Sequence, residues 1–194
     1  AQKDFDKALE TLKQVNQYQL SKEENTQYIM KLGYAKFMTG DSQGAIEALE
    51  EAYKTSEGSD KNDIAYMLGH LYYADGQSEE AFTFFDQIKD NEKYARVVKP
   101  YYVQLYFNDK DYDKAITEGN SLLNENISSD YKAEVHKMIG ESYFMKGDYE
   151  SAYPHLKNYL ESKGNPSESD LYEMGFVAAH LKKYDEAVSY YNQL

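Results

Sequence analysis

The chain has 194 residues and a formal net charge of −13, from 34 acidic and 21 basic side chains. Only one basic residue, Arg96, is an arginine, which disfavours nucleic acid and anionic membranes as partners because both are bound through basic footprints. Cysteine is absent, which excludes disulfides and thiolate metal sites, and no apolar run is long enough to span a membrane.

In chain order, the pattern predicts one short helix near residues 4–16 and then five pairs of helices joined by tight turns. Turns such as Gly40-Asp41 and Gly147-Asp148 place a glycine where one helix must end and a polar cap where the next begins. Ser21 and Glu24 have capping-box spacing. The expected helices are 22–39 and 42–55, 61–75 and 78–89, 93–108 and 112–125, 130–146 and 149–162, and 168–181 and 184–194.

An alanine follows each turn at nearly constant spacing. Successive gaps between these alanines are 37, 36, 34, 37 and 35 residues, a period typical of stacked helix pairs. The alanines are Ala8, Ala45, Ala81, Ala115, Ala152 and Ala187.

Twelve residues before five of these alanines lies a mid-helix position that is glycine in four repeats. Glycine within a helix costs about 1 kcal/mol relative to alanine, so we expect a packing role: close approach of the two helices of a pair. These positions are Gly33, Gly69, Val103, Gly140 and Gly175.

The third repeat departs most from the others. Val103 replaces the glycine, Gly119 stands where a large apolar residue is expected, and Pro100 lies inside the first helix, where it removes a backbone donor. The sequence therefore predicts a kink or a softened joint between repeats two and three.

These positions resemble the tetratricopeptide repeat family over essentially the whole chain. Two of the repeats that carry the family pattern read Leu68-Gly69, Tyr72, Ala81 and Phe85, and Ile139-Gly140, Tyr143, Ala152 and Leu156. The resemblance implies an all-α, right-handed superhelical solenoid of antiparallel helix pairs.

On this interpretation residues 1–194 form a single array. It comprises a partial repeat at 1–18 and repeats at 21–56, 60–91, 93–126, 129–163 and 167–194, the last possibly cut short. We expect the sequence to be a portion of something longer.

The resemblance also implies that the first helix of each pair lines a concave face. Because aromatic residues at helical spacing are often core, we expect about half of the candidates to pack between helices. The candidate partner-binding residues are Tyr34, Phe37, Met38, Tyr66, His70, Tyr73, Tyr101, Gln104, Phe107, Lys137, Glu141, Met145, Tyr172 and Phe176.

No catalytic constellation is recognisable. The four histidines are scattered one per element, without the spacing of metal ligands, and no glycine-rich phosphate loop is present. We therefore predict a protein that is not an enzyme and has no catalytic residue, metal or cofactor. The histidines are His70, His136, His155 and His180.

The leading hypothesis is a scaffold that binds a protein, as a peptide or a partner helix, in the concave groove. Two alternatives remain open: a glycan- or small-ligand-binding module, since tyrosines beside acidic and amide groups suit sugar rings, and a spacer within a larger repeat protein. A looser resemblance to large exported repeat proteins of Gram-negative bacteria implies a periplasmic or exported location and leaves a cytoplasmic one open. The oligomeric state is not predicted.

Overall fold

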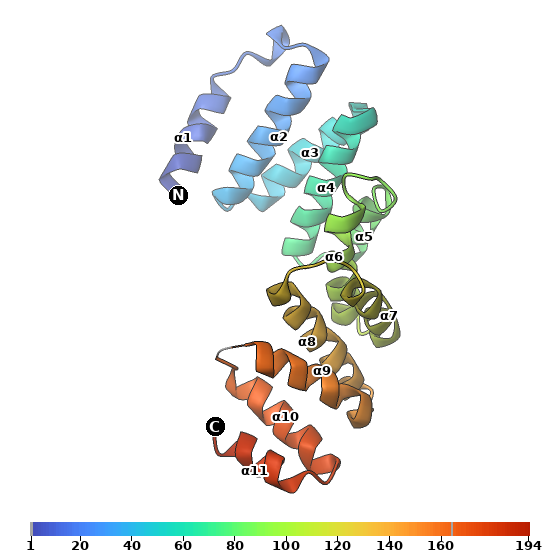
Figure 1. Ribbon diagram of the computed structural model, residues 1–194. Helices are drawn as coiled ribbons and strands as arrows, with labels where there is room; N and C mark the ends of the chain where they lie inside the picture. Colours follow the sequence, from blue (N-terminus) through green and yellow to red (C-terminus); the bar gives the residue numbers. More distant parts are fainter. Residues whose placement is uncertain (1, 164) are drawn as a thin grey trace. The chain divides into compact units, whose positions relative to one another are not determined.

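A computed structural model describes residues 2–163 and 165–194. Over these residues the chain forms α-helices and one short 3-10 helix at Gln17–Gln19, with no β-strand (Figure 1). The all-α helix-pair fold predicted from the repeat spacing is confirmed. The α-helices are α1 Gln2–Lys13, α2 Lys22–Met38, α3 Ser42–Thr55, α4 Gly58–Ala74, α5 Ser78–Asp86, α6 Ala95–Asn108, α7 Tyr112–Leu123, α8 Ser129–Met145, α9 Tyr149–Ser162, α10 Glu168–His180 and α11 Tyr184–Tyr191.

The chain divides into two compact units, Ala1–Val98 and Lys99–Leu194, and α6 crosses the boundary. In the first unit, each helix from α1 to α5 packs against the next. In the second unit, α7 to α11 pack in the same consecutive way. No helix in the described part of the chain is long and apolar enough to cross a membrane.

Side-chain caps fix where several helices begin. Ser21 accepts a hydrogen bond from the backbone N–H of Glu24 while the Glu24 carboxylate accepts one from Ser21, which completes the predicted capping box. Asp41, Asp111 and Asp148 each accept a backbone N–H at the start of the second helix of a pair. These caps satisfy donors that a helix leaves unpaired in its first turn.

The mid-helix glycines allow close approach of paired helices, as predicted, but the residue that approaches is not the alanine twelve positions later. A β-carbon added at Gly140 would lie 2.7 Å from Leu156, and one at Gly33 would lie 2.9 Å from Leu49. In both cases the neighbour is sixteen residues on, one helical turn past the alanine. The leucine side chain occupies the space above each glycine, and a β-carbon on that glycine would collide with it.

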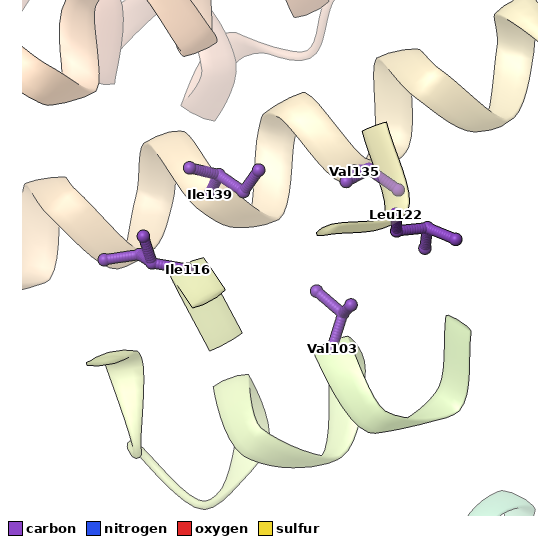
Figure 2. Packing of buried hydrophobic residues seen from close by; sticks show 5 residues of the cluster. All are labelled: Val103, Ile116, Leu122, Val135 and Ile139. Carbon is purple, nitrogen blue, oxygen red and sulfur yellow. The ribbon is translucent and has the colours of Figure 1, made fainter. Parts of the chain in front are cut away.

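In the third repeat the large residue, Val103, is on the first helix and the glycine, Gly119, is on the second. This corrects the prediction that a large residue is missing at Gly119. Val103 and Gly119 are also sixteen residues apart, so the large and the small residue have exchanged helices. A β-carbon at Gly119 would lie 2.7 Å from Ile139 of α8 and 3.6 Å from Val103. Figure 2 shows Val103 and Ile139 in the cluster that closes this space, together with Ile116, Leu122 and Val135.

Pro100 lies inside α6, which continues on both sides of it to Asn108. The boundary between the two compact units falls at Val98 and Lys99, next to this proline. The predicted kink or softened joint stays a prediction.

Candidate functional site

The first helices of repeats one and two, α2 and α4, enclose a hollow of about 230 Å³. We call it the α2–α4 hollow. Four of its lining residues belong to the set predicted from the sequence, and Met67 and Leu71 complete it. The lining is Tyr34, Phe37, Tyr66, Met67, His70 and Leu71.

Ring contacts hold the walls of this hollow. Phe37 and His70 meet edge to face with centroids 6.1 Å apart. Tyr66 is stacked on Tyr94 at 5.1 Å, and Tyr34 meets Phe5 of α1 at 5.7 Å. Such arrangements are worth about 0.5–1.5 kcal/mol each beyond the burial of area, so they favour a pre-formed shape.

The α2–α4 hollow is uncharged at neutral pH. Burial lowers the pKa of His70, so its imidazole is neutral there. Beside Tyr66, Asp63 accepts hydrogen bonds from the Tyr94 hydroxyl and from Nζ of Lys93, the latter at 2.8 Å. That network fixes the ring on which Tyr66 is stacked.

In the second unit, the corresponding first helices carry charge instead. Lys137 of α8 donates to Asp170 of α10 at 2.7 Å, and its Nζ lies 3.6 Å from Glu141. With Glu173, these residues form what we call the α8–α10 charged face. Lys137 and Glu141 were predicted from the sequence.

Asp170 organises this face. It accepts hydrogen bonds from Lys137, from the Ser167 backbone N–H at 2.9 Å and from the Tyr159 hydroxyl at 3.2 Å. Burial raises the pKa of Asp170, but the hydrogen bonds from Lys137 and Ser167 outweigh it and lower the pKa to about 2. Asp170 is therefore a carboxylate at any physiological pH.

Glu173 has the opposite environment. Burial, and then the neighbouring Glu141, raise the pKa of Glu173 to about 7. Its Oε1 is buried and accepts no hydrogen bond from the described residues. Burial also raises the pKa of Glu141, with Lys137 acting against it. The face therefore holds more carboxylate than its one lysine can neutralise.

Comparison with known proteins shows which family part of this chain resembles. The tetratricopeptide repeat family model matches residues 30–95. The TPR repeat-containing protein MJ1428 of Methanocaldococcus jannaschii is 28% identical over 182 residues, which cover 86% of this chain and 30% of that protein. Over residues 30–95 the chain is therefore similar to the tetratricopeptide repeat family. It spans about a third of the length of this curated relative.

Solved structures share the fold of this chain. The apo form of RapI matches with a TM-score of 0.79 and 19% identity, over 97% of this chain and 58% of RapI. MamA from Desulfovibrio magneticus RS-1 matches with a TM-score of 0.72 and 14% identity, over 87% and 92% of the two chains. The structure described as pilF of Pseudomonas aeruginosa matches at 0.66 and 16%, over 88% and 75%. At these identities the likeness concerns the fold alone.

The other residues predicted from the sequence are more dispersed. In the first unit, Met38 is exposed and Tyr73 is half-buried, and neither lines the α2–α4 hollow. In the second unit, half-buried Tyr101 and Gln104 lie on α6, where Gln104 donates to Asn108 at 2.9 Å.

Further along the second unit, two predicted residues are half-buried among aromatic rings and two are exposed. Phe107 packs its ring on Tyr112 at 5.9 Å, and Phe176 lies among Phe144, Tyr149 and His180. Met145 and Tyr172 are both more than half exposed.

Sequence reasoning missed Asp170 and Glu173 as members of the charged face. Asp170 lies in the first turn of α10, where its carboxylate accepts the Ser167 backbone N–H in a capping box. Glu173 follows Tyr172 directly and precedes Phe176 by three positions, so its place on the first helix was a usable signal. Its burial was not.

Two histidines come together that the sequence pattern treats as separate. Nδ1 of His136 on α8 lies 3.0 Å from Nδ1 of His155 on α9, so one imidazole donates to the other. Burial, and then the proximity of His136, lower the pKa of His155 to about 4. Burial and Lys132 lower the pKa of His136. Among the described residues, no group of three or more histidine, cysteine, aspartate or glutamate side chains is placed to hold a metal ion.

Proposed function

We propose that this chain is a non-enzymatic protein-interaction scaffold that binds a peptide or partner helix on the faces of its first helices. The observation that carries the proposal is the α2–α4 hollow. It is apolar, walled by aromatic rings and lies between the first helices of two successive repeats. Concave, mostly apolar sites with a few polar groups are the usual form of binding sites.

The size of the hollow favours one side chain as its occupant. Drug-sized ligands occupy pockets of about 300–1,000 Å³, whereas this hollow measures about 230 Å³. Its polar groups are two tyrosine hydroxyls and one imidazole, from Tyr34, Tyr66 and His70. A sugar ring would need more hydrogen-bonding partners, so a leucine, methionine or phenylalanine of a peptide fits better.

Charge indicates the rest of the partner's chemistry. The chain carries −13, and the α8–α10 charged face has three carboxyl groups around Lys137. A lysine or arginine of the partner would place a positive charge beside Glu141 and Glu173. We therefore propose a partner with a basic segment and a large apolar anchor residue.

The experiment is a selection of phage-displayed 12-residue peptides against the full chain, followed by affinity measurements with single variants. Tyr34→Ala removes a half-exposed wall of the hollow and should weaken peptides with an apolar anchor at least tenfold. Tyr18→Ala is the matched control, because Tyr18 is fully exposed and outside the hollow. Selected peptides that bind Tyr34→Ala as tightly as the wild type would refute the role of the hollow.

The charge component has its own test. Glu173→Gln should weaken peptides rich in lysine or arginine severalfold, and the loss should shrink at high salt. Glu150→Gln removes the same formal charge from an exposed position of α9 and should change affinity little. Equal losses in the two variants would show that only the net charge matters.

A further inference from the structure

Two histidines, His136 and His155, occupy positions at which the other repeats carry different residues. We call them the histidine pair. His136 lies four residues before Gly140, and His155 lies three residues after the repeat alanine Ala152. At the same two positions the other repeats have Ile29 and Ala48, Ala65 and Phe84, Lys99 and Glu118, and Leu171 and Tyr190. The repeat pattern therefore does not require two imidazoles here.

The two ring nitrogens are as far apart as two neighbouring ligands of one metal ion. Nδ1 of His136 lies 3.0 Å from Nδ1 of His155. Bonds from a metal ion to an imidazole nitrogen are about 2.0–2.1 Å long. Two bonds of this length that end on atoms 3.0 Å apart meet at an angle of about 95°. This angle is close to the right angle of square-planar coordination and smaller than the tetrahedral angle of about 109° that Zn²⁺ prefers.

The histidine pair can exchange its hydrogen bond for a metal ion without losing a proton. In the hydrogen bond, one Nδ1 carries a proton and the other accepts it. A neutral imidazole can carry its proton on either nitrogen, so the donor ring can place it on Nε2 instead. Both Nδ1 lone pairs are then available to the same cation, and both rings stay neutral.

Protons compete little with a metal ion at this pair. Burial lowers the pKa of both histidines, and the pKa of His155 falls to about 4. Because metal ions bind the neutral imidazole, such a histidine remains a ligand in weakly acidic solution. Both side chains are only half-buried, so an ion can reach them from the solvent.

The charges around the pair act in opposite directions. Lys132, one turn before His136 on α8, lowers the pKa of that histidine and also repels a cation. The chain as a whole carries a charge of −13, which attracts one. Lys132 is therefore the side chain through which the affinity of the pair for a cation can be adjusted.

We propose that the histidine pair binds Cu²⁺, with the two Nδ1 atoms at neighbouring positions of a square-planar or tetragonal coordination sphere. Cu²⁺ favours this geometry with nitrogen and oxygen ligands and heads the affinity order of the divalent first-row metals. Water, or an oxygen or nitrogen atom of a binding partner, fills the remaining positions. The ion joins α8 to α9, the two helices of one repeat. This proposal departs from the sequence-based expectation that the chain has no metal.

The proposal is independent of the proposed function. None of the residues of the α2–α4 hollow or of the α8–α10 charged face is a ligand of the ion. Loss of peptide binding would leave the copper site in place, and loss of the copper site would leave the peptide surfaces in place.

The test uses the full chain, treated with EDTA, moved into metal-free buffer at pH 7 and titrated with copper(II) chloride by calorimetry. We expect one tight Cu²⁺ site whose electron paramagnetic resonance spectrum shows two nitrogen ligands. His136→Ala and His155→Ala should each weaken binding at least tenfold. His180→Ala removes an exposed histidine outside the pair and should leave the affinity unchanged.

A charge variant keeps both histidines in place. Lys132→Gln removes the neighbouring positive charge and should tighten Cu²⁺ binding severalfold. Lys54→Gln removes the same charge from an exposed position of α3 in the first unit and should change the affinity little. Zn²⁺ should bind the unaltered chain at least tenfold more weakly than Cu²⁺, because the pair does not match its preferred angle.

Three results would overturn the proposal. The first is an unaltered chain that binds no Cu²⁺ or shows fewer than two nitrogen ligands. The second is an affinity that is the same in the wild type and in both alanine variants, with their folding checked by circular dichroism, because the ion would then lie elsewhere. The third is an equal gain from Lys132→Gln and Lys54→Gln, which would trace the affinity to net charge. The first and third need no histidine variant, so they decide the question even where an alanine variant fails to fold.

Discussion

The α2–α4 hollow and the α8–α10 charged face occupy equivalent first helices, yet they are built from different chemistry. The hollow is walled by rings of Tyr34, Phe37, Tyr66 and His70, with no charged side chain in its lining. The charged face has Lys137 within reach of two carboxylates and a third carboxyl group, Glu173, whose buried Oε1 accepts no hydrogen bond from the part of the chain that the structure describes. The repeat scaffold fixes the positions, and a few substitutions at those positions decide what each face can bind.

The two faces also differ in how they contribute to stability. Rings that pack on rings give a stabilisation that hardly depends on pH near neutrality. A half-buried set of carboxyl groups gives a stabilisation that does depend on pH, because each group with a shifted pKa couples folding to proton binding. Four substitutions test this contrast and the dependence of stability on pH.

The largest effect should come from Asp170→Ala. It removes the capping-box partner of the N-cap residue Ser167 and leaves Lys137 and Tyr159 without their buried acceptor, so we expect the free energy of unfolding to fall by about 3 kcal/mol. Asp148→Ala is the control, because Asp148 is an exposed cap of α9 and its loss should cost about 1 kcal/mol. Urea denaturation measures both, and equal losses would mean that Asp170 acts only in the capping box.

In the hollow, Phe37→Ala should lower the free energy of unfolding by about 2 kcal/mol, since a half-buried ring and its contact with His70 are lost. The loss should be the same at pH 7 and pH 8.5, because no charged group lines the hollow. Tyr18→Ala should change stability by less than about 0.5 kcal/mol. A loss at Phe37 that varied strongly across this pH range would contradict the contrast between the two faces.

The sequence predicts the repeats and their helices more completely than it predicts the sites. Alanine spacing and turn residues suffice for helix pairs because both are local signals. That Leu156 lies over Gly140, or that Val103 and Gly119 exchange roles, depends on how two helix surfaces interlock. The aromatic lining of the hollow was predictable from helical spacing.

The charged face was only half predictable, for a physical reason. Lys137 and Glu141 share one helix, so their spacing is visible in the sequence, whereas Glu173 comes from another helix and its pKa depends on burial. The contact between His136 and His155 likewise joins separate helices. Neither burial nor contacts between helices can be read from a one-dimensional pattern.

The histidine pair gives the third prediction. The pKa of His155 falls from 6.5 to about 4 on folding, so the neutral form is favoured in the folded chain. Its stabilisation is fully present above pH 6.5 and is lost as the pH falls towards 4. Because His155 is only half-buried, we expect about 1–2 kcal/mol after allowance for solvent screening. His136 is the titratable group that lowers the pKa of His155, and Lys132 in turn lowers the pKa of His136.

Denaturation curves at pH 7 and pH 4.5 check this. His155→Gln should lose less stability between these pH values than the wild type, by about 1 kcal/mol or more. His180→Gln changes an exposed histidine and should leave the wild-type pH dependence in place. Parallel behaviour of His155→Gln and the wild type would show that the pair does not titrate with folding.

The smallest effect should come from Glu173→Gln, and its sign is opposite. The pKa of Glu173 rises from 4.5 to about 7 on folding, so its contribution is present below pH 4.5 and is lost as the pH rises through 7. Glutamine keeps the shape without the charge, so the variant should be about 1 kcal/mol more stable than the wild type at pH 8. At pH 4.5 the two should be equal, whereas exposed Glu150→Gln should match the wild type at both values. A stabilisation that persisted at pH 4.5 would trace to packing, and the charged face would then differ from the hollow in shape and not in its coupling to protons.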